Sequence, residues 1–214
     1  DTMVDLVVEN DTQPRLAAVV TDRGRQISAK AVVLTTGTFL EGKIYIGEYE
    51  AASGRLGEQA AIGLGTAMRE KGFTMGRLKT GTPPRILKNT IDFSTLEKQD
   101  GDPDVQGFSF SGKSVALDQV SCWVTYTNEE THRIISDNSH RSPLFSGKIQ
   151  GVGPRYCPSI EDKVLRFAER NRHQLFLEPE GLDTEEIYIN GLSSSLPEEV
   201  QDEFMRTIPG LADA

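Results

Sequence analysis

The chain has 214 residues, a length that suits one domain of about 150 residues together with part of another. It carries 23 Lys and Arg against 32 Asp and Glu, for a formal net charge of −9. This balance excludes a generally basic protein that coats nucleic acid, although a local basic patch is compatible with it. Hydrophobic residues make up 37% of the chain, enough for a folded core with large polar loops.

The ends and the cysteines bound the class of protein further. No apolar run reaches the ~20 residues that span a bilayer, and no secretory leader is present. Two cysteines, Cys122 and Cys157, do not make a disulfide framework, so we expect a reducing cytoplasm. The chain opens within a predicted strand and closes directly after a predicted helix. We therefore expect an internal segment of a larger protein, to which any function belongs.

The first 40 residues predict a β-rich region. Strands are expected at residues 3–9, 15–21 and 26–29. The apolar run at residues 31–35, which leads to Gly37, predicts a strand buried on both faces, as in a parallel sheet. A small meander that leads into such a strand is typical of flavoproteins that bind two dinucleotides, where the strand ends at the cofactor crevice.

The middle of the chain predicts a helix and then mostly irregular structure. The helix is expected at residues 57–71 with Gly72 just beyond its end, although Gly63 and Gly65 weaken this prediction. The paired prolines of residues 80–85 exclude regular structure there. We further expect a strand at 73–78, loops over 89–117, a strand at 120–125 and a helix at 129–136.

Two helices are predicted near the end. The first begins after Ser159, a helix cap with an acidic residue three positions on. The second is opened by a capping box that runs from Ser195 to Glu198, and Gly210 stops it. The apolar stripes expected to face the core are Val164, Phe167 and Ala168 in the first helix and Val200, Phe204 and Ile208 in the second.

The run at residues 151–163 is the strongest candidate for chemistry. Pro158 favours an extended conformation for Cys157, which places the thiol just ahead of a helix N-terminus. The helix terminus and Arg155 favour the thiolate, and the unpaired N–H groups of the first turn suit a pyrophosphate. A buried structural cysteine is the alternative for Cys157.

Other reactive side chains give weaker signals. Cys122 alternates with apolar residues in a predicted strand, so we expect it in the core. The three histidines, His132, His140 and His173, are scattered among polar residues and are expected at the surface or in loops. No metal-ligand spacing is present, so no metal site is predicted. Residues 69–88 hold six bases and one acid, which indicates either an anion site or a solvated face.

Residues 151–167 resemble the signature of the MnmG (GidA) family of tRNA-modifying flavoproteins. The resemblance continues at residues 29–43, 76–85, 125–129 and 176–181, and so covers essentially the whole chain. It implies an α/β fold: a partial FAD-binding Rossmann-like core of the glutathione-reductase type with an inserted α/β domain. Residues 1–78 would be part of the FAD-binding domain, and residues 79–208 would be the inserted domain associated with NADH and tRNA. Residues 209–214 would be the point where the chain returns to the FAD-binding domain.

The family resemblance also implies an activity. The family adds a carboxymethylaminomethyl or aminomethyl group to C5 of the wobble uridine of tRNA, together with a GTPase of the MnmE type. FAD, NADH and methylene-tetrahydrofolate as one-carbon donor are the implied small molecules, and a homodimer is the implied assembly. The alternatives are the related folate- and FAD-dependent tRNA uracil methyltransferase, against which the sequence of residues 156–159 argues, and a non-catalytic domain that binds RNA or a partner.

Carried over by resemblance, the FAD contacts fall on Met3 and Ala61, mostly through backbone, and Thr36, Gly37 and Thr38 line the flavin crevice. The implied nicotinamide-dinucleotide region comprises Gly153, Pro154, Arg155, Tyr156, Cys157, Pro158, Ser159, Ile160, Glu161, Asp162, Lys163, Val164, Leu165, Arg166 and Phe167.

The resemblance also suggests two roles for side chains. Cys157 is the candidate nucleophile, whose thiolate would add to C6 of the uracil so that C5 can attack a methylene donor. Alternatively, Cys157 only supports the dinucleotide-binding loop. Arg77, Lys79 and Arg85, on a scaffold stiffened by proline, are candidate contacts to tRNA phosphates, unless the prolines serve only to shape the flavin crevice.

Overall fold

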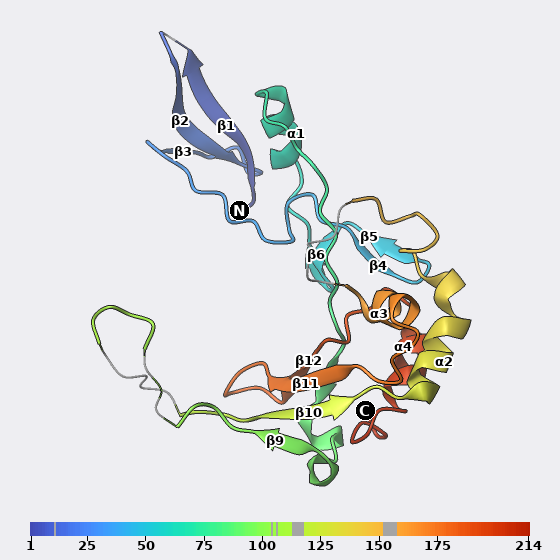
Figure 1. The fold of residues 1–214 in the computed structure, drawn as a ribbon. Helices are drawn as coiled ribbons and strands as arrows, with labels where there is room; N and C mark the ends of the chain where they lie inside the picture. Colours follow the sequence, from blue (N-terminus) through green and yellow to red (C-terminus); the bar gives the residue numbers. More distant parts are fainter. Residues whose placement is uncertain (11, 104, 106, 113–117, 152–157) are drawn as a thin grey trace. The chain divides into compact units, whose positions relative to one another are not determined.

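A computed structural model describes residues 1–214 except 11, 104, 106, 113–117 and 152–157 (Figure 1). The chain divides into two compact units, Asp1–Leu78 and Lys79–Ala214. Both contain strands and at least one helix, so the fold is mixed α/β. Among the described residues, no helix is both long and apolar enough to cross a membrane.

The first unit begins with an antiparallel meander in the order β1-β2-β3 (Figure 1), which confirms the predicted β-rich start. Its strands are β1 Met3–Asn10, β2 Pro14–Thr21 and β3 Gln26–Ser28. Two short hairpins follow, formed by β4 Ile44–Ile46 with β5 Tyr49–Ala51 and by β6 Ser53–Arg55 with β7 Glu58–Gln59. The one helix described in this unit is α1, Leu64–Glu70.

Three predictions for the first unit are wrong. Residues 31–35 form no strand, and Val33 is 85% exposed, because no described strand pairs with them to make the sheet that such a run requires. The helix begins at Leu64 rather than at residue 57, because Gly63 has a φ of 109° that lies outside the helical region. Residues 73–78 are irregular, whereas Gly72 follows the helix end as predicted, with a φ of 87°.

The second unit contains a five-stranded antiparallel sheet in the order β8-β12-β11-β10-β9 (Figure 1). Its strands are β8 Arg85–Leu87, β9 Glu97–Gln99, β10 Cys122–Tyr126, β11 Gln174–Pro179 and β12 Glu186–Asn190. Only β10 was predicted from the sequence. The helices are α2 Glu129–Asp137, α3 Ile160–Arg166 and α4 Glu198–Met205, with short 3-10 turns at Lys88–Thr90, Phe93–Thr95 and Ser139–Arg141.

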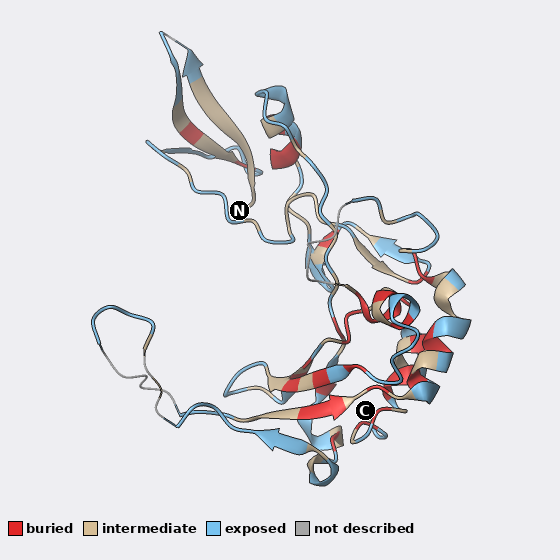
Figure 2. Cartoon of the chain, in the orientation of Figure 1, coloured by how far each residue is buried: buried red, intermediate tan, exposed pale blue. Residues whose placement is uncertain are grey.

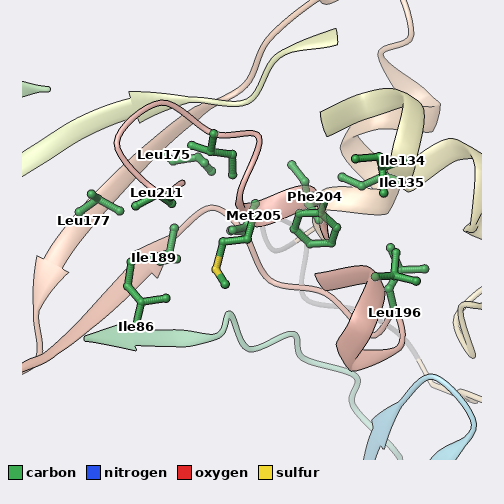
Figure 3. Close-up of a cluster of buried hydrophobic side chains, with 14 of the residues drawn as sticks. Ile86, Ile134, Ile135, Leu175, Leu177, Ile189, Leu196, Phe204, Met205 and Leu211 are labelled. Atoms are coloured by element: carbon green, nitrogen blue, oxygen red, sulfur yellow. The ribbon is translucent and has the colours of Figure 1, made fainter. Parts of the chain in front are cut away.

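The core of this unit lies between one face of the sheet and the helices (Figures 2 and 3). The strands supply Ile86, Leu175, Leu177, Ile187 and Ile189, while the buried helical residues are Ile134, Ile135, Ile160, Val164, Val200, Phe204 and Met205. Burial of each such side chain contributes about 1.5–3 kcal/mol to stability. Leu211 is fully buried in the same cluster, so residues 209–214 pack within the second unit.

The helix ends show where capping was predicted correctly. Ser159 caps α3 as expected, with its hydroxyl oxygen accepting the N–H of Asp162 at 3.3 Å. The capping box predicted for the last helix is wrong, because Pro197 is the cap of α4 and makes no side-chain capping bond. A capping box is instead present at α2, between Asn128 and Thr131.

The apolar stripes of these helices were predicted with mixed success. Val200, Phe204 and Ile208 are buried as expected, although α4 ends at Met205, before Ile208 and the predicted stop at Gly210. In the earlier helix only Val164 is buried, because α3 ends at Arg166 and leaves Phe167 42% exposed. Ala168, beyond that end, is exposed as well.

Candidate functional site

In the first unit, the segment that contains Thr36–Thr38 runs beside Ala61. The N–H of Ala61 donates to the carbonyl of Phe39 at 2.8 Å, and the N–H of Glu41 donates to the carbonyl of Ala61 at 2.9 Å. These bonds form an isolated parallel bridge between Leu40 and Ala61. Main-chain hydrogen bonds thus hold together residues that are far apart in sequence.

The strand that begins at Met3 contacts the chain just after Ala61. It begins β1 opposite Thr21, and its neighbour Val4 packs against Gly63, where an added Cβ would lie 3.4 Å from Cβ of Val4. Contacts of their neighbours thus link the segments that carry the five residues expected to contact FAD, namely Met3, Thr36, Gly37, Thr38 and Ala61. We call these five residues the N-terminal cluster.

Glu41 braces the N-terminal cluster and was not singled out from the sequence. Its carboxylate accepts hydrogen bonds from the N–H of Thr66 at 3.0 Å and from the guanidinium of Arg69 at 3.2 Å. Burial opposes ionisation of Glu41, but the bonds from Arg69 and Thr66 prevail and lower its pKa. The carbonyl of Glu41 also accepts a bond from Arg77 at 3.0 Å.

The N-terminal cluster fits a large cofactor recognised through backbone groups. Its side chains are small or half-exposed, and a Cβ built on Gly37 would meet no atom within 4 Å. Open space beside a glycine lets a ligand approach the main chain closely. The described residues are thus compatible with the flavin contacts that the family resemblance implies.

In the second unit, three segments that are remote in sequence meet: residues 79–85, 158–163 and 191–196. We call this the motif junction. Gly81 is pressed against Ser193 so closely that an added Cβ would lie 2.8 Å from the Ser193 side chain. The N–H of Ile160 donates to the carbonyl of Ser193 at 2.8 Å, and Nζ of Lys163 donates to the carbonyl of Gly191 at 2.9 Å.

Buried charges hold the motif junction together. Glu161 is fully buried, and its Oε1 accepts the N–H of Ser195 at 2.9 Å and the hydroxyl of Ser195 at 3.3 Å. Its Oε2 has no hydrogen-bond partner among the described residues. Asp162 pairs with Lys79 at 3.7 Å, and both side chains are almost as buried, with 11% and 12% exposed. Polar groups of this kind are costly to bury unless they are hydrogen-bonded or paired.

The predicted dinucleotide stretch lies only partly within the described residues. Residues 153–157, including the candidate nucleophile Cys157, fall outside them. Within residues 158–167, Ser159, Ile160, Glu161 and Asp162 are buried and form one side of the motif junction. Their role toward a nicotinamide dinucleotide stays a prediction.

The three predicted tRNA contacts all have partners within their own unit. Arg77 belongs to the first unit and bonds the Glu41 carbonyl, while Lys79 pairs with Asp162. Arg85 places its Nε 2.7 Å from Glu180 and its guanidinium carbon 4.8 Å from the ring centroid of Tyr188. The assignment of these residues to tRNA also stays a prediction.

The histidines were only partly placed by sequence reasoning. His173 lies in a loop, as one of the two expected placements, but it is 9% exposed, and its ring is tilted against that of His132 with centroids 5.2 Å apart. The hydroxyl of Thr127 lies 2.7 Å from Nε2 of His132 and accepts the backbone N–H of His173 at 2.8 Å. Burial lowers the pKa of both rings, and for His173 the nearby positive groups add to the effect.

Cys122 was expected in the core, but it is only half-buried and lies on the face of the sheet opposite the core cluster. The neighbouring Trp123 takes the core side instead. Burial, with a smaller effect from Glu178, raises the pKa of the Cys122 thiol.

Sequence reasoning also missed the 191–196 segment. Its residues have no distinctive pattern, and the segment is part of the site only through its contacts with residues 79–85 and 158–163.

Comparison with known proteins shows which family the chain resembles. All of residues 1–214 match the family model described as glucose inhibited division protein A. The chain is 60% identical to the tRNA uridine 5-carboxymethylaminomethyl modification enzyme MnmG of Treponema pallidum (strain Nichols), and 56% identical to the enzyme of the same name from Borrelia garinii subsp. bavariensis. Both matches include 100% of this chain.

The chain spans only about a third of the length of these relatives, 35% and 34% respectively. It also matches the crystal structure of GidA from Aquifex aeolicus (form I) with a TM-score of 0.86 and 52% identity, over 100% of this chain and 36% of that one. On these grounds, the chain belongs to the glucose inhibited division protein A family.

Proposed function

We propose that the complete protein containing this chain modifies tRNA at the wobble uridine, adding a carboxymethylaminomethyl or aminomethyl group to C5. The observation that carries the proposal is the match of all 214 residues to enzymes named for this modification, at up to 60% identity. The motif junction supports it, because it joins residues of two motifs on which the family resemblance rests, 76–85 and 151–167.

FAD and NADH are the proposed cofactors. The N-terminal cluster would hold FAD through the main chain around Thr36–Thr38 and Ala61, and this cofactor supplies hydride transfer when bound. Residues 153–167 would hold NADH, and methylene-tetrahydrofolate would donate the one-carbon unit. Within the described residues, the contribution of Glu161 is to fix the 193–195 segment against α3, so that the start of this helix has one position.

Cys157 is the proposed nucleophile. Its thiolate would form a bond to C6 of the uracil, which moves the C5–C6 π electrons toward O4 and makes C5 able to attack a methylene carbon. Loss of the C5 proton and expulsion of the thiolate would then restore the ring. Replacement of Cys157 by Ser should leave reduction of the flavin by NADH normal and abolish the tRNA product; full modification activity in this variant contradicts the role.

A GTPase of the MnmE type, a homodimeric assembly and a cytoplasmic location complete the proposal. A test for the first two is co-purification of the complete protein with such a GTPase, together with the mass of the unbound protein in solution. A monomer that never binds the GTPase contradicts both expectations.

The decisive experiment uses the complete protein encoded by this reading frame. We expect a protein near three times this length that carries FAD, is bleached by NADH, and converts unmodified tRNA into a product whose wobble nucleoside gains the mass of the C5 substituent. A mass gain of a single methyl group would favour the related tRNA uracil methyltransferase instead. A colourless protein that binds RNA but leaves it unchanged would favour the binding domain.

A further inference from the structure

The face of the five-stranded sheet that points away from the core carries a row of aromatic rings. Successive residues of a strand point to opposite faces, and Thr125, Leu175, Leu177, Ile187 and Ile189 are all buried. Their neighbours Tyr126, Phe176 and Tyr188 therefore share the opposite face, where each is half-buried. The buried apolar residues of helices α2, α3 and α4 all belong to the core cluster on the first face.

The strand register arranges these three rings on a diagonal. Tyr126 of β10 lies opposite Gln174, and Tyr188 of β12 lies opposite Glu178, with Phe176 midway between these two positions on the central strand β11. Each ring is therefore one strand across and two residues along from the next. With ordinary strand geometry this step is about 8 Å.

Both ends of the diagonal carry an arginine. The guanidinium carbon of Arg172 lies 4.5 Å from the ring centroid of Tyr126, and that of Arg85 lies 4.8 Å from the ring centroid of Tyr188. Arg172 forms no ion pair within the part of the chain that the structure describes, whereas Arg85 is paired with Glu180. Between the ends, Glu178 accepts a hydrogen bond from Asn190 at 2.9 Å.

This pattern of charge selects among ligands. The Glu178 carboxylate disfavours phosphate beside it, while guanidinium groups at the ends of the diagonal favour phosphate. Rings about 8 Å apart suit a ligand whose planar groups are separated from one another and connected by a flexible backbone. Unpaired RNA bases have this form, since single-stranded recognition relies on stacking with aromatic and guanidinium planes and on phosphate contacts at the margin.

We propose that the diagonal of Tyr126, Phe176 and Tyr188, with Arg172 and Arg85 at its ends, is a stacking platform for three consecutive unpaired bases of the RNA substrate. This inference rests on the proposed function, which makes tRNA the substrate and the anticodon loop its reacting part. It assigns the RNA contact to this half-buried sheet face, in addition to Arg77 and Lys79. Bases in a duplex are stacked on each other and do not fit it.

The test uses the complete protein and an unmodified anticodon stem-loop RNA that carries 2-aminopurine in the loop. Phe176→Leu keeps apolar bulk and removes the ring, so we expect about tenfold weaker binding and loss of the fluorescence change that stacking causes. The salt dependence of binding should stay the same. Arg172→Gln should lower the slope of log affinity against log salt by about 0.7, because one phosphate contact is lost.

Matched controls separate binding from folding. Phe93→Leu makes the same substitution in a ring that packs on Trp123 with centroids 4.4 Å apart, on the core side, and should leave RNA affinity unchanged. Tyr126→Phe keeps the ring and should bind as the wild type does. If Phe176→Leu does not fold, Tyr126→Leu at the end of the diagonal gives the same test and should again weaken binding about tenfold.

The outcomes distinguish this inference from the proposed function. If the wild-type protein binds the stem-loop and the Leu variants fold and bind it equally well, the stacking platform is contradicted and the proposed function is not. Leu variants that bind RNA normally but melt at a lower temperature show that protein covers this face, which also overturns the platform. Wild-type protein that binds no RNA overturns the proposed function and the platform with it.

Discussion

The N-terminal cluster and the motif junction bring remote segments together by different means. In the first unit the links are main-chain hydrogen bonds, such as that between Ala61 and Phe39, with the side chains small and partly exposed. In the second unit buried side chains, above all the fully buried Glu161, add to the main-chain bond between Ile160 and Ser193. A site held by main chain tolerates side-chain changes, whereas a site held by buried charges depends on each of them.

The largest effect is expected where a buried carboxylate is removed. Glu161→Ala leaves the N–H of Ser195 without its acceptor and opens a cavity, so the second unit should lose about 2–3 kcal/mol of stability. Urea unfolding followed through Trp123, which lies in β10, measures this loss. Glu161→Gln keeps an acceptor of the same size and should lose clearly less; equal losses for Ala and Gln would mean that the hydrogen bonds do not hold the junction.

A smaller loss is expected where backbone and side chain are in close contact. Gly81→Ala places a Cβ 2.8 Å from the Ser193 side chain, so the two segments must separate slightly, at a cost of about 1–2 kcal/mol. Gly76→Ala is the matched control, because an added Cβ there meets nothing within 4 Å. Thermal melting of both variants compares them; a Gly81→Ala variant as stable as Gly76→Ala would contradict the close approach.

A pH effect confined to the second unit should be weaker still. Burial lowers the pKa of His132 and His173 below the unfolded value of about 6.5, so the folded state prefers the neutral rings. The unfolded chain then binds more protons as the pH falls below about 6.5, and the stability present above that pH is progressively lost. Urea midpoints between about pH 7.5 and 5 should show this decline.

The control for the histidine prediction is the double variant His132→Gln and His173→Gln. Its stability should vary less with pH over the same range, because the groups that take up protons have been removed. A decline as steep as that of the wild-type protein would assign the pH dependence to other residues.

The smallest effect is expected in the N-terminal cluster. Thr38→Ala removes the hydroxyl that donates to the carbonyl of Gly54 at 2.7 Å at an exposed position, which should cost about 0.5–1 kcal/mol. Flavin affinity, measured by fluorescence titration, should change by less than about threefold, because the proposed contacts are made by main chain. Thr38→Ser restores the hydroxyl; a large loss of flavin in Thr38→Ala would show that the side chain itself recognises the cofactor.

The sequence was informative where local rules decide the structure. The opening meander, the Ser159 cap and the stripe of α4 follow from alternation, capping and helical periodicity, which act over a few residues. The strand predicted at residues 31–35 is wrong, because an apolar run forms a buried strand only if other strands surround it. Sequence reasoning also missed β11 and β12, although their alternating Leu175, Leu177, Ile187 and Ile189 carry the usual signal.

The candidate site was less predictable than the fold. The family resemblance identified the motifs at 76–85 and 151–167. The structure joins their described residues through the Lys79–Asp162 ion pair and through Gly191 and Ser193–Ser195, which have no distinctive pattern. The stacked pair of His132 and His173 likewise brings together two residues that share no sequence spacing. Contacts of this kind arise from tertiary packing, which local pattern does not encode.

The strand order of the second unit has a consequence for synthesis. β8 is the first strand of the sheet to be made, and its partner β12 is the last, with Arg85 pairing with Tyr188. About 100 residues must therefore leave the ribosome before β8 finds its neighbour, which at ordinary translation rates takes roughly 5–20 s. Pairing over such a separation is slow. We expect the nascent second unit to remain open until then, so that this stretch of the chain is the one most dependent on chaperones.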